Sequence, residues 1–250
     1  MVWWRKAQCP VRPVEQEWIE RSMDWLLAEF GRDRLLGPVV LPNDDWFPGA
    51  YRGTAREVEV LVGRLCDHMG VAADRIEIEH FSPDIGVELT AHVPLSVSGS
   101  GAAGHHRMRA GRSVIAIRED LAARPMELVA TVAHELGHAR LLAEGRVGPG
   151  REDHEPLTDL LTVFFGLGIF GANAAFDFSR EVRGDSVWTS TSRLGYLTEP
   201  MFGYGLARYA WLRDEPNPAW ARYLDTNPRS FLNRGLRYLT ETGGAGGGTR

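Results

Sequence analysis

The sequence predicts an α+β fold, in which a small mixed sheet precedes a pair of helices and further helices lie toward both ends. Three observations indicate this class. Residues 75–81 alternate apolar and polar side chains, as a half-buried strand does. Residues 102–109 and 113–118 form a strand–turn–strand pattern. Residues 125–143 then show the spacing of an amphipathic helix. A second, weaker strand is expected at 87–95.

Two helices are expected before the first strand. One spans residues 14–30 and ends before Gly31. The other opens at Thr54, with Glu57 three residues later as a capping box, and ends at Gly70. Their apolar residues recur at helical spacing, and we expect them to face the core. They are Trp18, Ile19, Met23, Leu26 and Phe30 in the first helix and Val58, Leu61, Val62, Leu65 and Met69 in the second.

The C-terminal part of the chain is expected to be helical, after a polar loop at 179–194. Its helical segments are 199–214, 218–224 and 228–241. We therefore predict four regions along the chain. They are an N-terminal helical region at 1–73, a core at 74–178, a C-terminal helical region packed on the core at 179–242 and a disordered tail at 243–250.

The composition is that of a soluble globular protein. Of its 250 residues, 44% are apolar and 24% charged. The net charge of −5 gives no basic surface for nucleic acid, so no nucleic-acid partner is predicted. The start of the chain lacks the apolar region of a signal peptide, and the apolar run at 161–176 is shorter than the ~20 residues of a membrane span. We expect a cytoplasmic protein, in which Cys9 and Cys66 are free thiols.

The pentapeptide His134-Glu135-Leu136-Gly137-His138 is an instance of H-E-x-x-H on the helix expected at 125–143. Residues four apart lie on one face of a helix, so His134 and His138 can point at the same spot. Two converging imidazoles are two of the three protein ligands of a catalytic zinc site. Glu135 is placed to take a proton from a water at the metal. The alternative to a metal site is that this segment is an ordinary helix whose polar residues are exposed to solvent.

A third ligand is available at the start of the next helix, which we expect to begin near Asp153. Glu155 and Asp159 lie one turn apart there. This spacing favours Glu155 as the metal ligand and Asp159 as the acceptor of a hydrogen bond from a ligand histidine. His154 is the alternative ligand.

The motifs of residues 101–170 resemble those of gluzincins, and in particular of the compact ImmA/IrrE-like type. The matching segments are GAAGHH, VIAIRE, TVAHELGH and EPLTD. The resemblance implies a zincin-like core, with zinc at His134, His138 and Glu155 and with Glu135 as general base. It also implies a peptide substrate that lies antiparallel to strand 113–118 and adds to its edge.

We therefore expect a zinc-dependent metallopeptidase. The first alternative is a zinc-binding regulatory or interaction protein without peptidase activity, and the second is an interaction module in which the motif is incidental. Peptide hydrolysis needs a hydrogen-bond donor for the oxyanion. The candidates are His105, His106, Tyr196 and Tyr204, for each of which surface exposure or core packing is the simpler interpretation.

Overall fold

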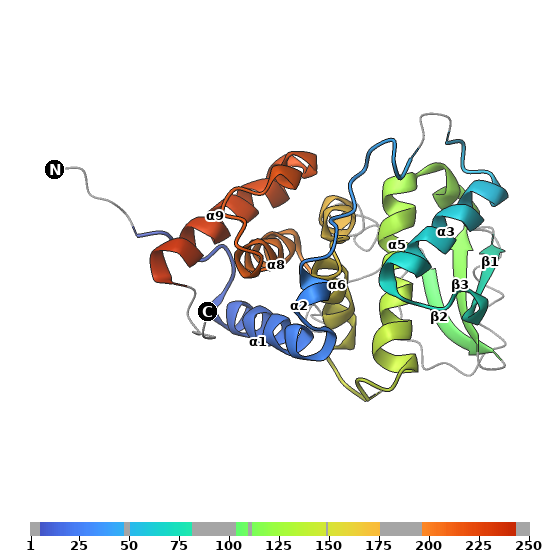
Figure 1. Cartoon of the computed structure of the whole chain (residues 1–250), viewed down its shortest axis with the longest axis horizontal. Coiled ribbons are helices and arrows are strands. Elements are labelled where there is room, and N and C mark those ends of the chain that lie inside the picture. The colour runs from blue at the N-terminus through green and yellow to red at the C-terminus, as the bar shows by residue number, and fades with distance from the viewer. Residues whose placement is uncertain are drawn as a thin grey trace, which may run out of the picture. The chain divides into compact units, whose positions relative to one another are not determined.

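The computed structural model describes residues 6–47, 51–81, 104–109, 112–148, 150–175 and 197–243. It has mixed α and β structure and is mostly helical, as Figure 1 shows. The strand expected at 87–95, the loop expected at 179–194 and the tail after Gly243 lie outside these residues. No helix in the described ranges is both long enough and apolar enough to cross a membrane.

The described helices and strands follow the order expected from the sequence. They are α1 (Pro13–Phe30), α2 (Arg32–Leu35), α3 (Ala55–Met69), β1 (Ile76–Phe81), β2 (Gly104–Arg109), β3 (Arg112–Arg118), α5 (Pro125–His138), α6 (His154–Phe164), α8 (Glu199–Leu212) and α9 (Thr226–Thr242). Residues 168–175 are also helical, and short 3₁₀ segments lie at Ala73–Arg75, Glu119–Ala123 and Ala219–Tyr223.

The chain divides into two compact units. One contains α3, the sheet and α5, and the other contains α1, α2, α6, α8 and α9. α1 and α3 belong to different units, and the four regions predicted along the chain stay a prediction. An amphipathic pattern shows that a helix face is covered, but it does not identify the element that covers it.

The sheet has three described strands in the order β1-β3-β2. β1 runs parallel to β3, and β2 runs antiparallel to it as the predicted hairpin requires. β3 is therefore the central strand, paired with a neighbour on each side. The prediction that a substrate chain adds to the edge of strand 113–118 is wrong, because β1 and β2 already occupy both edges of that strand.

Helix α3 confirms the prediction made for it, whereas in α1 the predicted core residues Ile19, Met23 and Leu26 are buried and Trp18 and Phe30 are only partly buried. Glu57 closes the capping box of α3, since its carboxylate accepts the Thr54 backbone N–H at 2.8 Å and the Thr54 hydroxyl accepts the Glu57 N–H at 3.4 Å. The Thr54 N–H also holds the pKa of the Glu57 carboxyl below its usual value. Gly70 ends α3 in the left-handed conformation. The apolar residues predicted to face the core of α3 are all buried, and they are Val58, Leu61, Val62, Leu65 and Met69.

Both cysteines that the sequence contains are free, as expected. Cys66 lies on the buried face of α3, and burial raises the pKa of its thiol to about 11. The thiol is therefore protonated at neutral pH, and Cys66 serves as a core residue.

The two long C-terminal helices follow the predicted ranges to within two residues at each end. α9 begins at Thr226, two residues before the expected start at Pro228. Proline lacks only an N–H that the first turn of a helix leaves unpaired, so Pro228 fits inside that turn. α8 and α9 pack closely through glycines, since a Cβ on Gly235 would lie 2.6 Å from the Cβ of Ala207.

Most of the described residues of the apolar run at 161–175 are buried, and a turn at Gly166 divides this run into α6 and the helical segment 168–175. Gly166 has a φ of +80°, and a Cβ there would lie 2.7 Å from the carbonyl oxygen of Pro38. The Gly166 carbonyl also accepts the Val40 N–H at 2.9 Å. Both the conformation and the space at this position require glycine.

We expect Gly166→Ala to lower the free energy of unfolding by about 2 kcal/mol, because the new methyl group meets backbone and the backbone conformation disfavours a side chain. Urea denaturation measures the change. Gly63→Ala in α3 is the matched control, since a Cβ there meets nothing within 4 Å. The control is expected to stabilise the chain by up to ~1 kcal/mol. Equal effects of the two substitutions would contradict this explanation of Gly166.

Candidate metal centre

Helix α5 carries the H-E-x-x-H motif and is anchored by its apolar residues. It begins at Pro125, where the missing N–H costs no helical hydrogen bond. The predicted apolar stripe is completely buried, and its members within α5 are Leu128, Val129, Val132 and Leu136. Their packing fixes the rotation of the helix about its axis, and it thereby fixes the direction of the histidine-bearing face.

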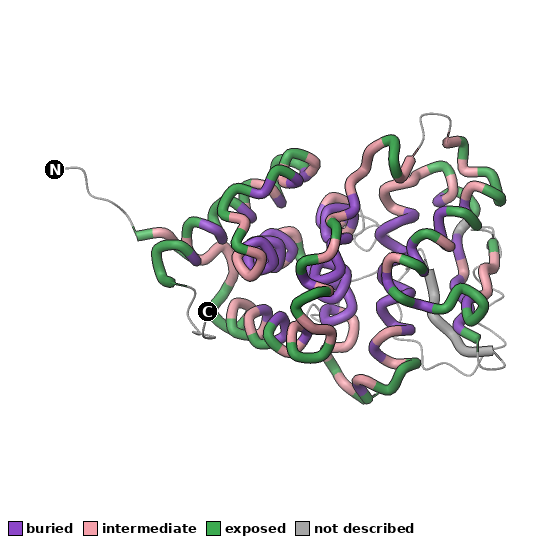
Figure 2. The backbone as a smooth tube through the Cα atoms, in the orientation of Figure 1, coloured by how far each residue is buried: buried purple, intermediate pink, exposed green. Residues whose placement is uncertain are grey.

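The motif residues of α5 are buried as well, and Figure 2 colours parts of this helix as buried. The exposed fractions are only 7% for His134, 5% for Glu135 and 5% for His138. The alternative of a helix with exposed polar residues is therefore wrong. Ionisable side chains are costly to bury unless they are hydrogen-bonded, paired or bound to a metal. The burial of these three motif residues is therefore typical of a functional site and not of a solvated surface.

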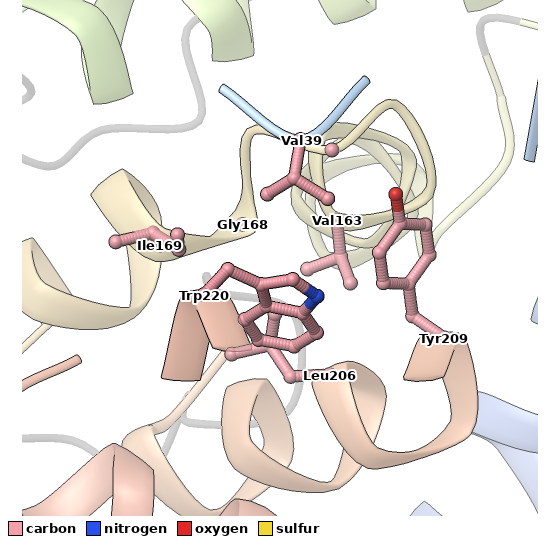
Figure 3. Close-up of a pocket in the computed structure, with 8 residues that line it drawn as sticks. Val39, Val163, Gly168, Ile169, Leu206, Tyr209 and Trp220 are labelled. Atoms are coloured by element: carbon pink, nitrogen blue, oxygen red, sulfur yellow. The ribbon is translucent and has the colours of Figure 1, made fainter. Parts of the chain in front are cut away.

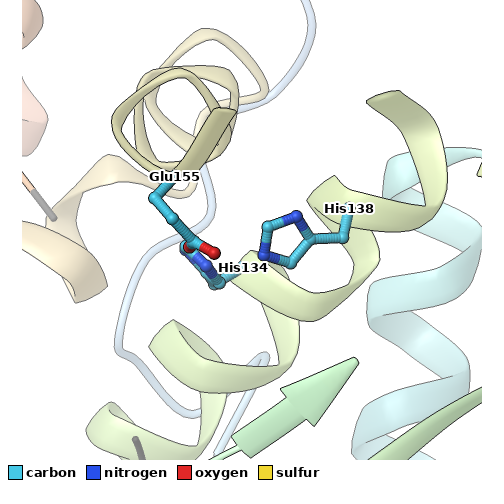
Figure 4. A group of neighbouring side chains, drawn as sticks. All are labelled: His134, His138 and Glu155. Atoms are coloured by element: carbon cyan, nitrogen blue, oxygen red, sulfur yellow. The ribbon is translucent and has the colours of Figure 1, made fainter. Parts of the chain in front are cut away.

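His134, His138 and Glu155 form a group that could hold a metal ion (Figure 4). One ligand atom of each residue lies within 4.8 Å of the others. The two imidazole rings are 4.7 Å apart between centroids and nearly perpendicular, at 85°. The spacing of four residues on α5 thus brings the two histidines together as predicted, and Glu155 joins them.

The local sequence explains where Glu155 stands. α6 starts at His154, so Glu155 lies in its first turn, where the helix dipole favours a negative charge. Pro156 follows and is tolerated because the N–H groups of the first turn have no partner within the helix. After this turn α6 is buried on all sides, and its buried residues run from Pro156 to Phe164.

The donor set fits a transition-metal ion. Two imidazole nitrogens and one carboxylate oxygen suit zinc and its neighbours in the first transition row, whereas calcium and magnesium prefer sites made of oxygen alone. Three protein ligands also leave a coordination position for water or substrate, as catalytic sites require.

Asp159 lies one turn after Glu155 on α6 and is 7% exposed. Its Oδ2 accepts the backbone N–H of Leu197 at 2.9 Å. Its carboxylate therefore helps to attach the segment before α8. The predicted hydrogen bond from a ligand histidine to Asp159 stays a prediction.

His154, the alternative ligand, is not a member of the group of three. Its ring centroid lies 5.8 Å from that of His138, and the ring planes are tilted by 59°. His154 is only partly buried, whereas His134 and His138 are almost completely enclosed. The imidazole of His154 therefore lies near His138 without being part of the group of three.

Tyr204, a candidate oxyanion donor, is a fully buried residue of α8 whose hydroxyl donates a hydrogen bond to Glu20 of α1. Burial, together with the bond to Glu20, raises the pKa of this hydroxyl well above its usual value. Arg208, one turn later, pairs with Asp24 at 2.9 Å. These contacts join α1 to α8, so Tyr204 has a structural role. Tyr196 lies outside the described residues, and His105 and His106 lie in β2, where only the backbone is described.

The sequence did not predict two features near the motif. Directly after His138 the helix continues as a wider π-helical turn, Ala139–Ala143, a form that often occurs at functional sites. One turn before Glu135, the Thr131 hydroxyl is buried and has no hydrogen-bond partner within the described part of the chain. Thr131 lies three residues before His134, so a polar group is present on the motif-bearing face.

A small pocket in the unit that contains α1, α6 and α8 is apolar and includes no residue of the metal-binding group (Figure 3). It contains about 160 Å³ of space, part of it open to solvent. Its lining residues are Val39, Val163, Gly166, Gly168, Ile169, Leu206, Tyr209 and Trp220. Ligand pockets usually enclose roughly 300–1,000 Å³. The space beside Trp220 is smaller, and we interpret it as a gap in the packing of apolar side chains.

Comparison with protein-family models, with curated proteins and with solved structures finds no match to this chain.

Proposed function

We propose that this chain is a zinc metallopeptidase, which hydrolyses peptide bonds with a water activated at the group of His134, His138 and Glu155. The observation that carries the proposal is that His134, His138 and Glu155 come together, with both histidines and the adjacent Glu135 almost completely buried. Two imidazoles and a carboxylate match catalytic zinc sites, which keep one position for water or substrate.

His134, His138 and Glu155 would hold the metal. Bound zinc would supply a Lewis acid and would lower the pKa of water. Glu135 follows His134 directly on α5, so its carboxylate extends from the same part of the helix. In the proposed reaction it accepts a proton from the attacking water and passes it to the leaving nitrogen. Burial at 5% exposure keeps bulk water from competing for that proton.

The substrate is proposed to be an extended peptide that adds to β2. Among the described strands, β2 is paired with β3 on one side only. α5, which carries the motif, contacts β2 within the same unit (Figure 1). A peptide that pairs with the outer edge of β2 gains main-chain hydrogen bonds without regard to its sequence. This proposal replaces the edge of β3, which is occupied.

The test is to measure bound metal and peptide cleavage in the same preparation. We expect about one equivalent of zinc in protein purified without chelator, and cleavage of unfolded protein that stops on chelation and returns with zinc. Less than about half an equivalent would contradict the metal site. Bound zinc without cleavage of unfolded protein or of a peptide library would instead identify a zinc-binding protein that is not a peptidase.

A further inference from the structure

We propose that Thr131 is a specificity-determining residue, whose hydroxyl forms a hydrogen bond with a polar side chain of the substrate beside the scissile peptide bond. This inference rests on the proposed function and adds to it the class of substrate residue that the site prefers. The preferred side chains carry an amide or a hydroxyl group, because a threonine hydroxyl can both donate and accept a hydrogen bond.

Thr131 lies on the face of α5 that carries the metal-binding histidines. It precedes His138 by seven residues, and because a helix has about 3.6 residues per turn, the two side chains differ in direction by only about 20°. It precedes His134 by three residues, which is about 5 Å along the helix axis. The next residue, Val132, belongs to the buried apolar stripe and points about 100° away. Thr131 therefore belongs to the face of the metal-binding group and not to the apolar stripe.

The hydroxyl of Thr131 is buried and is not bonded to its own helix. Thr131 is 7% exposed, and its Oγ1 has no hydrogen-bond partner within the part of the chain that the structure describes. Other helical threonines bond back to a carbonyl of their own helix. The Thr162 hydroxyl donates to the Asp159 carbonyl at 2.7 Å, and the Thr240 hydroxyl makes the same kind of bond in α9 at 2.8 Å. Because Thr131 makes no such bond, its hydroxyl is available to a group that does not belong to α5.

The fold alone does not account for a hydroxyl at this position. A buried hydroxyl without a partner destabilises a chain, since it has lost its hydrogen bonds to water. Valine has nearly the same shape as threonine and a similar helix propensity, so valine would serve the packing of α5 better. A partner that arrives with the substrate explains why a hydroxyl stands at Thr131, in line with the metal-binding residues.

The length of the side chain indicates which part of the substrate it meets. A threonine hydroxyl stays close to its own helix, whereas the ring nitrogens of His134 and His138 extend farther from it. The scissile carbonyl belongs at the metal, so it lies beyond the reach of Thr131. A substrate side chain that points from the peptide toward α5 can reach the hydroxyl, and α5 contacts β2, the strand to which the peptide is proposed to add.

The first measurement is the Tm of the zinc-free chain and of Thr131→Val, which removes the hydroxyl and keeps the shape. We expect Tm to rise by about 2–4 °C, because the variant no longer buries a hydroxyl without a partner. Thr162→Val is the matched control, since it makes the same change at a buried helical threonine whose hydroxyl is bonded, and its Tm should fall. A fall in Tm for Thr131→Val would show that the hydroxyl has a partner in the free chain, and it would overturn the inference.

The second measurement uses two probes whose side chains have nearly equal shape, the hydroxamates of N-acetylasparagine and N-acetylleucine. The hydroxamate group binds to metal centres, and calorimetry on the zinc-loaded full chain gives each dissociation constant. We expect the wild type to bind the asparagine probe about tenfold more tightly than the leucine probe. Thr131→Ser and Thr162→Val should keep this preference, and Thr131→Val should lose it.

Cleavage of a peptide library provides the third measurement. The wild type should prefer bonds next to asparagine, glutamine, serine or threonine, and Thr131→Val should shift this preference toward apolar residues.

The outcomes separate this inference from the proposed function. A wild type that binds the two probes equally, or a Thr131→Val chain that keeps the wild-type preference, would overturn the inference while peptide cleavage still supports the proposed function. A wild-type chain that binds no metal overturns both. If the wild type binds zinc without cleaving peptides, the proposed function fails alone, and the two probes still decide whether the Thr131 hydroxyl binds a polar side chain.

Discussion

Glu135→Gln is expected to lower kcat for peptide hydrolysis by about 10²–10⁴-fold while zinc content stays at the wild-type level. Glutamine has nearly the same shape as glutamate, but its amide cannot accept the proton of the attacking water. Because Glu135 is 5% exposed, no bulk water replaces it as a base. The measurement is cleavage of a fluorogenic peptide at saturating concentration, with bound metal determined on the same sample.

Glu127→Gln is the matched control, since it makes the same change in the same helix. Glu127 lies in the first turn of α5, two turns before Glu135, and its partner is Arg124 at 3.9 Å. We expect the control to keep wild-type kcat and zinc content. A Glu135→Gln chain that cleaves at the wild-type rate would show that another group is the base, and loss of zinc in Glu135→Gln would show that Glu135 supports the metal ligands instead.

Local sequence signals predicted the local structure well, because the physics behind them acts over a few residues. The capping box of Thr54 and Glu57 depends on hydrogen bonds between residues three apart, and it is present in α3. The apolar spacing of α5 predicted which residues are buried on its apolar side. The pairing of His134 with His138 needs only the helical repeat, which explains why it was predictable.

Features that depend on distant residues were not predictable in the same way. The alternation of strand 113–118 shows a buried strand, but it does not specify whether one neighbour or two pair with it, and β3 turned out to be central. Tyr204 could be an oxyanion donor or a core residue by sequence alone. Its partner, Glu20, is 184 residues away, and no local pattern links the two.

The metal-binding group combines both kinds of information. The four-residue spacing predicted the two histidines, and a carboxylate in the first turn of the next helix predicted Glu155. The sequence did not predict that His134, Glu135 and His138 are all buried, because the helical period gives only the relative directions of side chains. The wider turn at Ala139–Ala143 was also not predicted, since a run of alanine and leucine favours an ordinary α-helix.

Removal of the metal is expected to destabilise the chain strongly. Zinc present at about a thousand times its Kd adds ~4 kcal/mol of stability by mass action, which for a chain of this size raises Tm by about 10 °C. Glu155→Ala should lose most of this zinc-dependent rise, because only two protein ligands remain. Differential scanning calorimetry of apo and zinc-loaded protein measures the rise for each variant.

Glu152→Ala is the control for this experiment, since it removes an exposed carboxylate three residues before Glu155. Its Tm should rise with zinc as the wild type does. If Glu155→Ala keeps the rise while His154→Ala loses it, His154 is the third ligand and the assignment of Glu155 fails. If both variants keep the rise, zinc binds elsewhere in the chain. Loss of the rise in Glu155→Ala alone supports the assignment of Glu155 as the third ligand, independently of any assay of cleavage.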